Sequence, residues 1–95
     1  MLFSVVGRFK PGVEAERDAL HEQFSDHLRQ PLMHIRLAGV VRDADTGDRK
    51  GVLLLIEADD RQAIDHFLEE SPYAKEGLYE GVDVDELVIE AGGLN

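Results

Sequence analysis

The sequence GVLLLIEA at residues 51–58 is the stretch that decides the fold of this chain. An apolar run this short, preceded by a turn-forming segment, is typical of a β-strand. Side chains alternate along a strand, so two apolar sets point to opposite faces: Val52, Leu54 and Ile56 to one, Leu53 and Leu55 to the other. Both faces of this strand are therefore expected to be buried.

The neighbouring segments predict the rest of a sheet. Residues 43–48 are polar and contain Gly47, and residues 35–41 before them are rich in β-formers, so residues 35–58 are expected to form a β-hairpin. Residues 2–9 form another strand, closed by a turn at Pro11 and Gly12. A fourth strand is expected over residues 81–90, where the alternation changes phase at Leu87 and indicates a bulge or bend.

Two segments carry apolar residues at helical spacing. The first helix is expected between Val13 and Arg29 and ends at Pro31, with this apolar stripe: Val13, Leu20, Phe24 and Leu28. The second follows a capping residue at Asp59 or Asp60 and ends at Ser71-Pro72, with this apolar face: Ala63, Ile64, Phe67 and Leu68. Each helix therefore has one face to pack against the sheet.

The resulting order, β-α-β-β-α-β, is the ferredoxin-like plan of the α+β class, in a single domain over residues 1–95 with a loose tail at residues 91–95. Right-handed crossovers place both helices on one face of a four-stranded antiparallel sheet. The other face also needs cover, because monomers avoid large exposed apolar patches. A second copy of the sheet is the simplest cover, so we expect a homodimer that forms a dimeric α+β barrel.

The charge of the chain excludes some classes of partner. Its 20 acidic and 10 basic residues give a net charge of -10, and the excess acid lies in residues 51–95. This field repels phosphate backbones and anionic lipid, so neither nucleic acid nor a membrane is an expected partner. The basic residues Arg36, Arg42, Arg49 and Lys50 are interpreted as decoration of a solvated hairpin, because no aromatic residue alternates with them to stack bases.

Composition also bears on the compartment. Apolar residues in positions 1–10 are interrupted by Ser4, Gly7 and Arg8, which indicates neither a signal peptide nor a membrane span. The chain has no cysteine, which fits a reducing compartment. A cytoplasmic location is therefore expected.

Histidines are the first candidates for chemistry. His21 and His27 flank the apolar stripe of the first helix, where a histidine can hold a pKa near neutrality and still meet a substrate. A half-buried structural role is the commoner one for such positions. His34, just before the second strand, and His66, on the outer face of the second helix, are weaker candidates.

Neither a metal nor a cofactor is expected. The glycine-rich loops, H-E-x-x-H and cysteine motifs that hold common cofactors are absent from the sequence. Asp43, Asp45 and Asp48 suggest calcium, but an EF-hand loop needs a glycine at its sixth position and a glutamate at its twelfth. Gly47 is fifth and Leu54 is twelfth, so a hairpin turn is the better interpretation.

The segment SPYAKEGLY at residues 71–79 resembles the D-P-[FY]-x-x-A-G-[LV]-[FY] segment of the YciI-like (YCII-related) family, within the dimeric α+β barrel superfamily. His21 followed by Phe24, and then Leu37-Ala38-Gly39, are similar to that family's helix-one H-x-x-[FY/L] and strand-two L-x-A-G-P. The resemblance implies a dimer, a cleft near the sheet edge and a histidine–aspartate acid–base pair. It also implies an activity, since at least one member is a dehydrochlorinase acting on a chlorinated hydroxyhydroquinone.

Carried over to this chain, the family histidine is His21. The family aspartate falls on Ser71, its strand-two proline on Val40 and the alanine before its glycine on Glu76. Serine cannot act as a carboxylate base, so any carboxylate partner of His21 is expected to be Glu70, Glu76 or an acid of the second subunit. Pro72, Tyr73 and Gly77 of this segment are candidate substrate-binding residues, although shaping the turn into the fourth strand is the favoured interpretation of their role.

Three functions remain open. The first is a cofactor-independent acid–base enzyme, a lyase or dehydrochlorinase, acting through His21 on a small aromatic or carbonyl compound. The second is a small-ligand-binding or accessory dimer without catalysis, and the third is a cofactor-free monooxygenase or isomerase. A carboxylate within hydrogen-bond distance of His21 would favour catalysis, and an isolated His21 would favour binding or a structural role.

Overall fold

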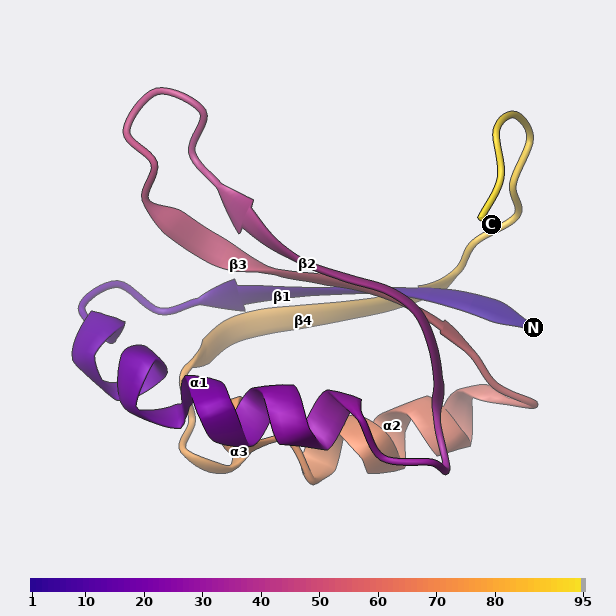
Figure 1. The fold of residues 1–95 in the computed structure, drawn as a ribbon, viewed down its shortest axis with the longest axis horizontal. Coiled ribbons are helices and arrows are strands. Elements are labelled where there is room, and N and C mark those ends of the chain that lie inside the picture. Colours follow the sequence, from indigo (N-terminus) through magenta and orange to yellow (C-terminus); the bar gives the residue numbers. More distant parts are fainter. Residues whose placement is uncertain (95) are drawn as a thin grey trace.

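A computed structural model describes residues 1–94 and contains one four-stranded sheet. Its strands are β1 (Leu2–Phe9), β2 (His34–Arg42), β3 (Arg49–Glu57) and β4 (Tyr79–Glu86). They are antiparallel in the order β2-β3-β1-β4. Three helices, α1 (Glu14–Leu28), α2 (Arg61–Glu69) and the single turn α3 (Pro72–Lys75), cover one face of the sheet (Figure 1). The expected ferredoxin-like arrangement is confirmed.

The core lies between this sheet face and the helices. Val52, Leu54 and Ile56 of β3 are buried there, as alternation in residues 51–58 predicts. Phe24 of α1 and Ile64 of α2 are buried against the same cluster. Full burial of an aliphatic or aromatic side chain contributes about 1.5–3 kcal/mol, so these few residues supply much of the driving force for folding.

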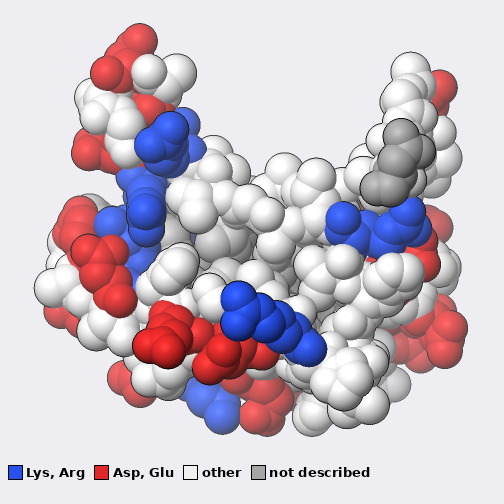
Figure 2. Space-filling model, in the orientation of Figure 1, with Lys and Arg blue, Asp and Glu red and all other residues white. Residues whose placement is uncertain are grey.

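The other sheet face has no helix over it. Leu53 and Leu55 of β3 and Val6 of β1 are half-buried on this face, while Leu37 and Val41 of β2 are exposed. The β2–β3 hairpin and the segment after β4 rise on either side of it (Figure 1). Figure 2 shows that the hollow between these two arms is mostly uncharged. We call the five side chains Val6, Leu37, Val41, Leu53 and Leu55 the open-face patch.

The predicted extent of the fourth strand is wrong at both ends. β4 begins at Tyr79 and ends at Glu86, because β1, the strand it pairs with, starts at Leu2 and offers no further backbone partner. The last contact is a hydrogen bond from the Leu87 amide to the Leu2 carbonyl. The phase change at Leu87 therefore marks the end of the strand. The register of the β1–β4 pairing instead shifts at the other end of the strand, between Arg8 and Phe9 of β1.

The second helix begins and ends as its capping pattern predicts. Asp60 is its N-cap, and its Oδ1 accepts a hydrogen bond of 3.0 Å from the Ala63 amide. Pro72 then opens α3, a position where proline is favoured because its missing N–H would have no helical partner. Gly77 follows with φ of 68°, a left-handed conformation that suits glycine, and turns the chain into β4.

The tail after β4 rises away from the sheet on its helix-free side (Figure 1). Within it, the Leu94 carbonyl accepts a hydrogen bond of 3.2 Å from Nη2 of Arg36. The expectation of a loose tail also covers Asn95, which lies outside the described residues. No helix in residues 1–94 is long and apolar enough to cross a membrane.

Candidate functional site

A cavity of about 170 Å³ lies between α1 and the part of the sheet formed by β2 and β3. Its walls are mainly aromatic and aliphatic and come from several elements: Phe9, Phe24, Leu28, Val40, Leu54 and Tyr73. Phe24 stacks on Tyr73 with ring centroids 4.4 Å apart, which fixes one wall. β2 is one of the two edge strands, so the cavity lies near a sheet edge, as the family resemblance implies.

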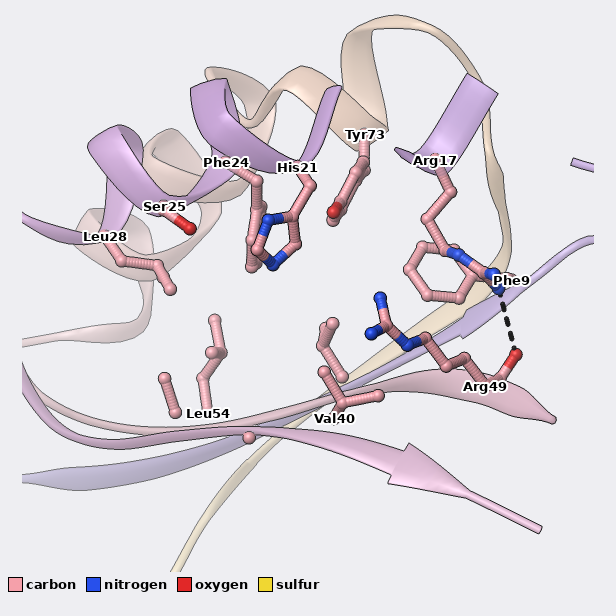
Figure 3. A pocket seen from close by; sticks show the side chains of 13 residues that line it. Phe9, Arg17, His21, Phe24, Ser25, Leu28, Val40, Arg49, Leu54 and Tyr73 are labelled. Carbon is pink, nitrogen blue, oxygen red and sulfur yellow. Dashed lines mark hydrogen bonds between the residues drawn. The ribbon is translucent and has the colours of Figure 1, made fainter. Parts of the chain in front are cut away.

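Polar groups gather on one side of this cavity. His21 projects into it from α1, and the guanidinium of Arg49 projects toward it from the sheet (Figure 3). A polar groove adjoins the cavity and shares Arg17, His21 and Arg49 with it. The cavity with these three residues at its mouth is the candidate site.

His21 is isolated within the described chain. None of the hydrogen bonds or ion pairs among residues 1–94 involves its imidazole. Glu70, one expected partner, instead pairs with Lys75 at 3.2 Å, and this ammonium lowers the pKa of the Glu70 carboxyl. Glu76 lines a separate depression beside Leu20. Three carboxylates line the adjoining groove, those of Glu14, Asp18 and Asp48.

Arg17 of α1 is held at the mouth by contacts with β1 and β3. Its side chain is only 11% exposed, and its guanidinium carbon lies 5.4 Å from the centre of the Phe9 ring. Nη1 donates a hydrogen bond of 3.2 Å to the Arg49 carbonyl. Its buried Nε has no hydrogen-bond partner in residues 1–94, with the Asp18 carboxylate 3.7 Å away. Arg17 therefore retains unused donor capacity.

The two tyrosines near the site keep their protons at neutral pH. Burial raises the pKa of Tyr73, and the positive charges of Arg17 and Arg49 act against this rise. Burial likewise raises the pKa of Tyr79 far above its usual value. Tyr73 lines the cavity, so it offers a neutral hydroxyl there as a hydrogen-bond donor.

Ser71, at the family aspartate position, lies apart from the cavity lining. It is 1% exposed, and its Oγ has no hydrogen-bond partner in the described residues. The hydroxyl lies close enough to Tyr79 to oppose slightly the burial-driven rise in the pKa of that phenol, but the contact lacks hydrogen-bond geometry. Ser71 is thus a buried neutral residue at the N-cap of α3, outside the lining of the cavity.

The remaining residues from the resemblance divide between two roles. Tyr73 joins His21 at the cavity. Pro72 starts α3 and borders a different depression, beside His27 and Glu70. Gly77 is exposed in the turn before β4. The structure therefore brings together His21 and Tyr73, whereas Pro72 and Gly77 shape the chain between α2 and β4.

The other histidines have structural surroundings. His27 stacks on Phe67 at 4.3 Å, and its Nε2 donates a hydrogen bond of 2.9 Å to the Phe67 carbonyl. Nδ1 then accepts from Gln30 at 3.1 Å, which completes the ring's hydrogen bonding. His34 faces Glu57 at 3.2 Å, and His66 is exposed on α2. Of the four, His21 alone lines the cavity.

The aspartate cluster forms the hairpin turn that was expected. Asp43 Oδ1 accepts hydrogen bonds of 2.9 Å from the amides of Asp45 and Thr46, and Oδ2 lies 3.5 Å from Lys50 Nζ. These amides, and then Lys50, lower the pKa of the Asp43 carboxyl. Residues 1–94 contain no group of three or more acidic, histidine or cysteine side chains that could hold a metal ion.

Sequence reasoning missed two residues of the site. Arg49 was interpreted as part of a solvated hairpin, and it is indeed exposed, but its side chain also lines the cavity. Arg17 was not considered, although it precedes His21 by one helical turn. Residues four apart share a helix face, so this spacing was the available signal.

The comparisons with known proteins agree with this geometry. The sequence matches the YCII-related domain over residues 1–88. The chain belongs to the YCII-related family. The sequence of this chain has no match among curated proteins.

Solved structures give further likenesses to this YCII-related chain. The 5-chloro-2-hydroxyhydroquinone dehydrochlorinase TftG from Burkholderia phenoliruptrix AC1100, in complex with 2,5-dihydroxybenzoquinone, is 26% identical with a TM-score of 0.85 over 93% of this chain and 94% of that one. A protein from Chloroflexus aurantiacus J-10-fl named as an antibiotic biosynthesis monooxygenase is 14% identical, with a TM-score of 0.54 over 97% and 98% of the two chains. The likeness to the Chloroflexus aurantiacus protein shows a shared fold alone. The fold is that of the dimeric α+β barrel proteins.

Proposed function

We propose that this chain binds a small six-membered ring compound in the cavity between α1 and the sheet, and that His21 exchanges a proton with the bound ring. The observation that carries the proposal is that His21 and Tyr73 line the same cavity. The first supplies a titratable imidazole and the second a neutral hydroxyl donor. The two family residues that the fold brings together are thus those able to act on a ligand.

The cavity has the size and lining for one ring. Its volume is about 170 Å³, and an apolar protein cavity of about 150 Å³ is known to bind benzene. The rings of Phe24 and Tyr73 and the side chain of Leu54 provide apolar and aromatic contact surface. A planar ring would bury most of its surface here, while a substituent could reach the polar mouth.

The likeness to TftG supports an elimination reaction. Its name states that it removes hydrogen chloride from 5-chloro-2-hydroxyhydroquinone. In such a step a bond to hydrogen and the C–Cl bond break, the proton passes to a base and chloride leaves with its bonding electrons. No oxidant or reductant is consumed. In this chain His21 is the base, and the Tyr73 hydroxyl donates a hydrogen bond to a ring oxygen.

Ligand binding without turnover is the second candidate function. It is favoured by the isolation of His21, since no carboxylate in residues 1–94 hydrogen-bonds to its imidazole and Ser71 replaces the family aspartate. A histidine without such a partner can still accept a proton at neutral pH, but its ring is less firmly oriented. The monooxygenase or isomerase alternative has only the shared fold in its support.

We also propose that the chain acts as a homodimer through the open-face patch. Leu37 and Val41 of this patch are 41% and 40% exposed, and Leu53 and Leu55 lie between them and β1. Ion pairs at its border, Arg8–Asp83 and Arg36–Glu57, give a polar rim around an apolar centre. A second sheet packed on this face would cover it and would leave the cavity, on the helix side, accessible.

Chloride release from 5-chloro-2-hydroxyhydroquinone tests the catalytic proposal. The parent chain should release chloride, and His21→Asn should lower the rate by about 100- to 10,000-fold, the usual contribution of a general base. His66→Asn, at an exposed position of α2, is the matched control and should retain the parent rate. Saturable binding of 2,5-dihydroxybenzoquinone without chloride release would favour the second candidate. Failure of both binding and release would contradict the proposed function.

A further inference from the structure

We propose that Arg17 and Arg49 form an anion-binding pair that makes the cavity select rings with an ionised oxygen substituent, a carboxylate or an enolate, over neutral rings of the same shape. The inference rests on the proposed function, because it takes the ring to lie in the cavity. It adds the chemical class of the ligand and the residues that recognise it.

The position of the two arginines is the first support. Both line the apolar cavity and also the polar groove beside it, so they stand where the two meet. Arg49 directs its guanidinium toward the cavity from the sheet side, opposite His21 (Figure 3). A substituent on a ring held between Phe24 and Leu54 would emerge at this boundary.

The available donors are the second support. In residues 1–94 no ion pair involves the Arg49 guanidinium. Arg17 donates one N–H to the Arg49 carbonyl, and its Nε lies 3.7 Å from the exposed Asp18 carboxylate. The buried Nε of Arg17 makes no hydrogen bond. The Arg17 side chain is 11% exposed, and its ion pair with the solvent-exposed Asp18 carboxylate lacks a hydrogen bond, so an anionic ligand oxygen could add a hydrogen-bonded partner.

The charge distribution is the third support. The chain carries a net charge of -10, so its long-range field disfavours anions. The cavity lining is the local exception, because it contains two arginines and a histidine and no aspartate or glutamate of residues 1–94. The acids of the groove, Glu14, Asp18 and Asp48, lie outside this lining. An anionic substituent would therefore be attracted to the arginines at the cavity mouth.

The surroundings of Tyr73 agree with this arrangement. The positive charges of Arg17 and Arg49 both act on its phenol, and both favour its ionised form against the effect of burial. They would act in the same sense on an ionised oxygen of a ligand beside that hydroxyl. Arg17, Arg49 and Tyr73 would then surround one negatively charged oxygen with donors.

Benzoate and benzamide make a matched pair of probes, since they share a ring and differ in the charge of the substituent. Titration followed by ¹H–¹⁵N NMR should show benzoate binding about tenfold more tightly than benzamide, the effect expected of a hydrogen bond to a charged group. Arg49→Gln should bring this ratio close to one and leave benzamide affinity unchanged. Arg17→Lys, which keeps the charge but loses the planar donor pair, should reduce the ratio in part. Arg61→Gln, on α2, is the control and should keep the parent ratio.

The outcomes separate this inference from the proposed function. Equal affinity for both probes would overturn the anion-binding pair and leave the ring site standing. A parent ratio that persists in both Arg49→Gln and Arg17→Lys would also overturn it, because the selectivity would arise elsewhere. Failure of both probes to bind in the millimolar range would contradict both proposals together.

Discussion

Nη1 of Arg17 donates a hydrogen bond of 3.2 Å to the backbone carbonyl of Arg49. The contact joins the first half of α1 to the first residue of β3, so it fixes the helix across the mouth of the cavity (Figure 3). Both side chains line the cavity, and Figure 3 shows the Arg49 guanidinium directed into it and away from this hydrogen bond. Because Arg17 lies over Phe9 as well, the mouth joins residues of α1, β1 and β3.

Truncation of Phe24 should be severely destabilising. Its ring is 8% exposed and stacked on Tyr73, so Phe24→Ala should lower the free energy of unfolding by about 3–5 kcal/mol through lost transfer energy and an enlarged cavity. Phe24→Leu, which keeps an apolar side chain, should lose less. Urea unfolding measures both, and coincident midpoints of Phe24→Ala and the parent would contradict the packing described.

A methyl group at Gly7 should be poorly tolerated. A β-carbon there would lie 2.7 Å from Cε1 of Tyr79, which packs over this position from β4. Gly7→Ala should therefore cost about 1–3 kcal/mol, the usual effect of overpacking. In the double variant with Tyr79→Leu the added cost of the methyl should largely disappear, a coupling that thermal unfolding can measure. Simple additivity of the two changes would argue against the close approach.

The Asp43 carboxyl should titrate below its ordinary pKa of 3.8, because the amides of Thr46 and Asp45 hydrogen-bond to its charged form. A depressed native pKa stabilises the fold above the unfolded pKa, and this contribution is lost as the pH falls through the native value. NMR titration should give a midpoint under 3.8, and Asp43→Asn should make the acid-side loss of stability less steep. A midpoint at or above 3.8 would show that the turn does not stabilise the charge.

A charge in the open-face patch should dissociate the proposed dimer. Leu53 lies on the open face of β3, so Leu53→Asp would place a carboxylate where a partner sheet is expected. Light scattering should give twice the chain mass of 10.6 kDa for the parent and the single mass for the variant. Leu32→Asp is the control, since Leu32 is 86% exposed in the α1–β2 connection and should leave the dimer intact. A parent mass of 10.6 kDa at micromolar concentration is the contrary result.

Local pattern was sufficient for most of the fold. The alternation in residues 51–58 separated the core face from the open face correctly, because a strand has a strict two-residue period. The end of β4 could not be predicted from local pattern in the same way. β4 ends where its pairing partner β1 begins, at Leu2, and this pairing joins segments far apart in the chain.

The site was predictable only where a motif marked it. His21 and Tyr73 were identified through their family pattern, and both line the cavity. Arg17 and Arg49 were missed because charged residues on a helix and a hairpin are usually solvated, and only packing shows that these two face a cavity. Ser71 occupies the aligned position of a family aspartate, yet its burial outside the cavity lining is a property of the three-dimensional arrangement.

The measurement that tests the central claim most directly is the set of intermolecular nuclear Overhauser effects between 2,5-dihydroxybenzoquinone and the labelled protein. The claim predicts contacts from the ligand ring protons to the rings of His21, Phe24 and Tyr73, which line one cavity. Contacts that fall instead on the open-face patch around Leu53 and Leu55, with none to His21, would contradict it.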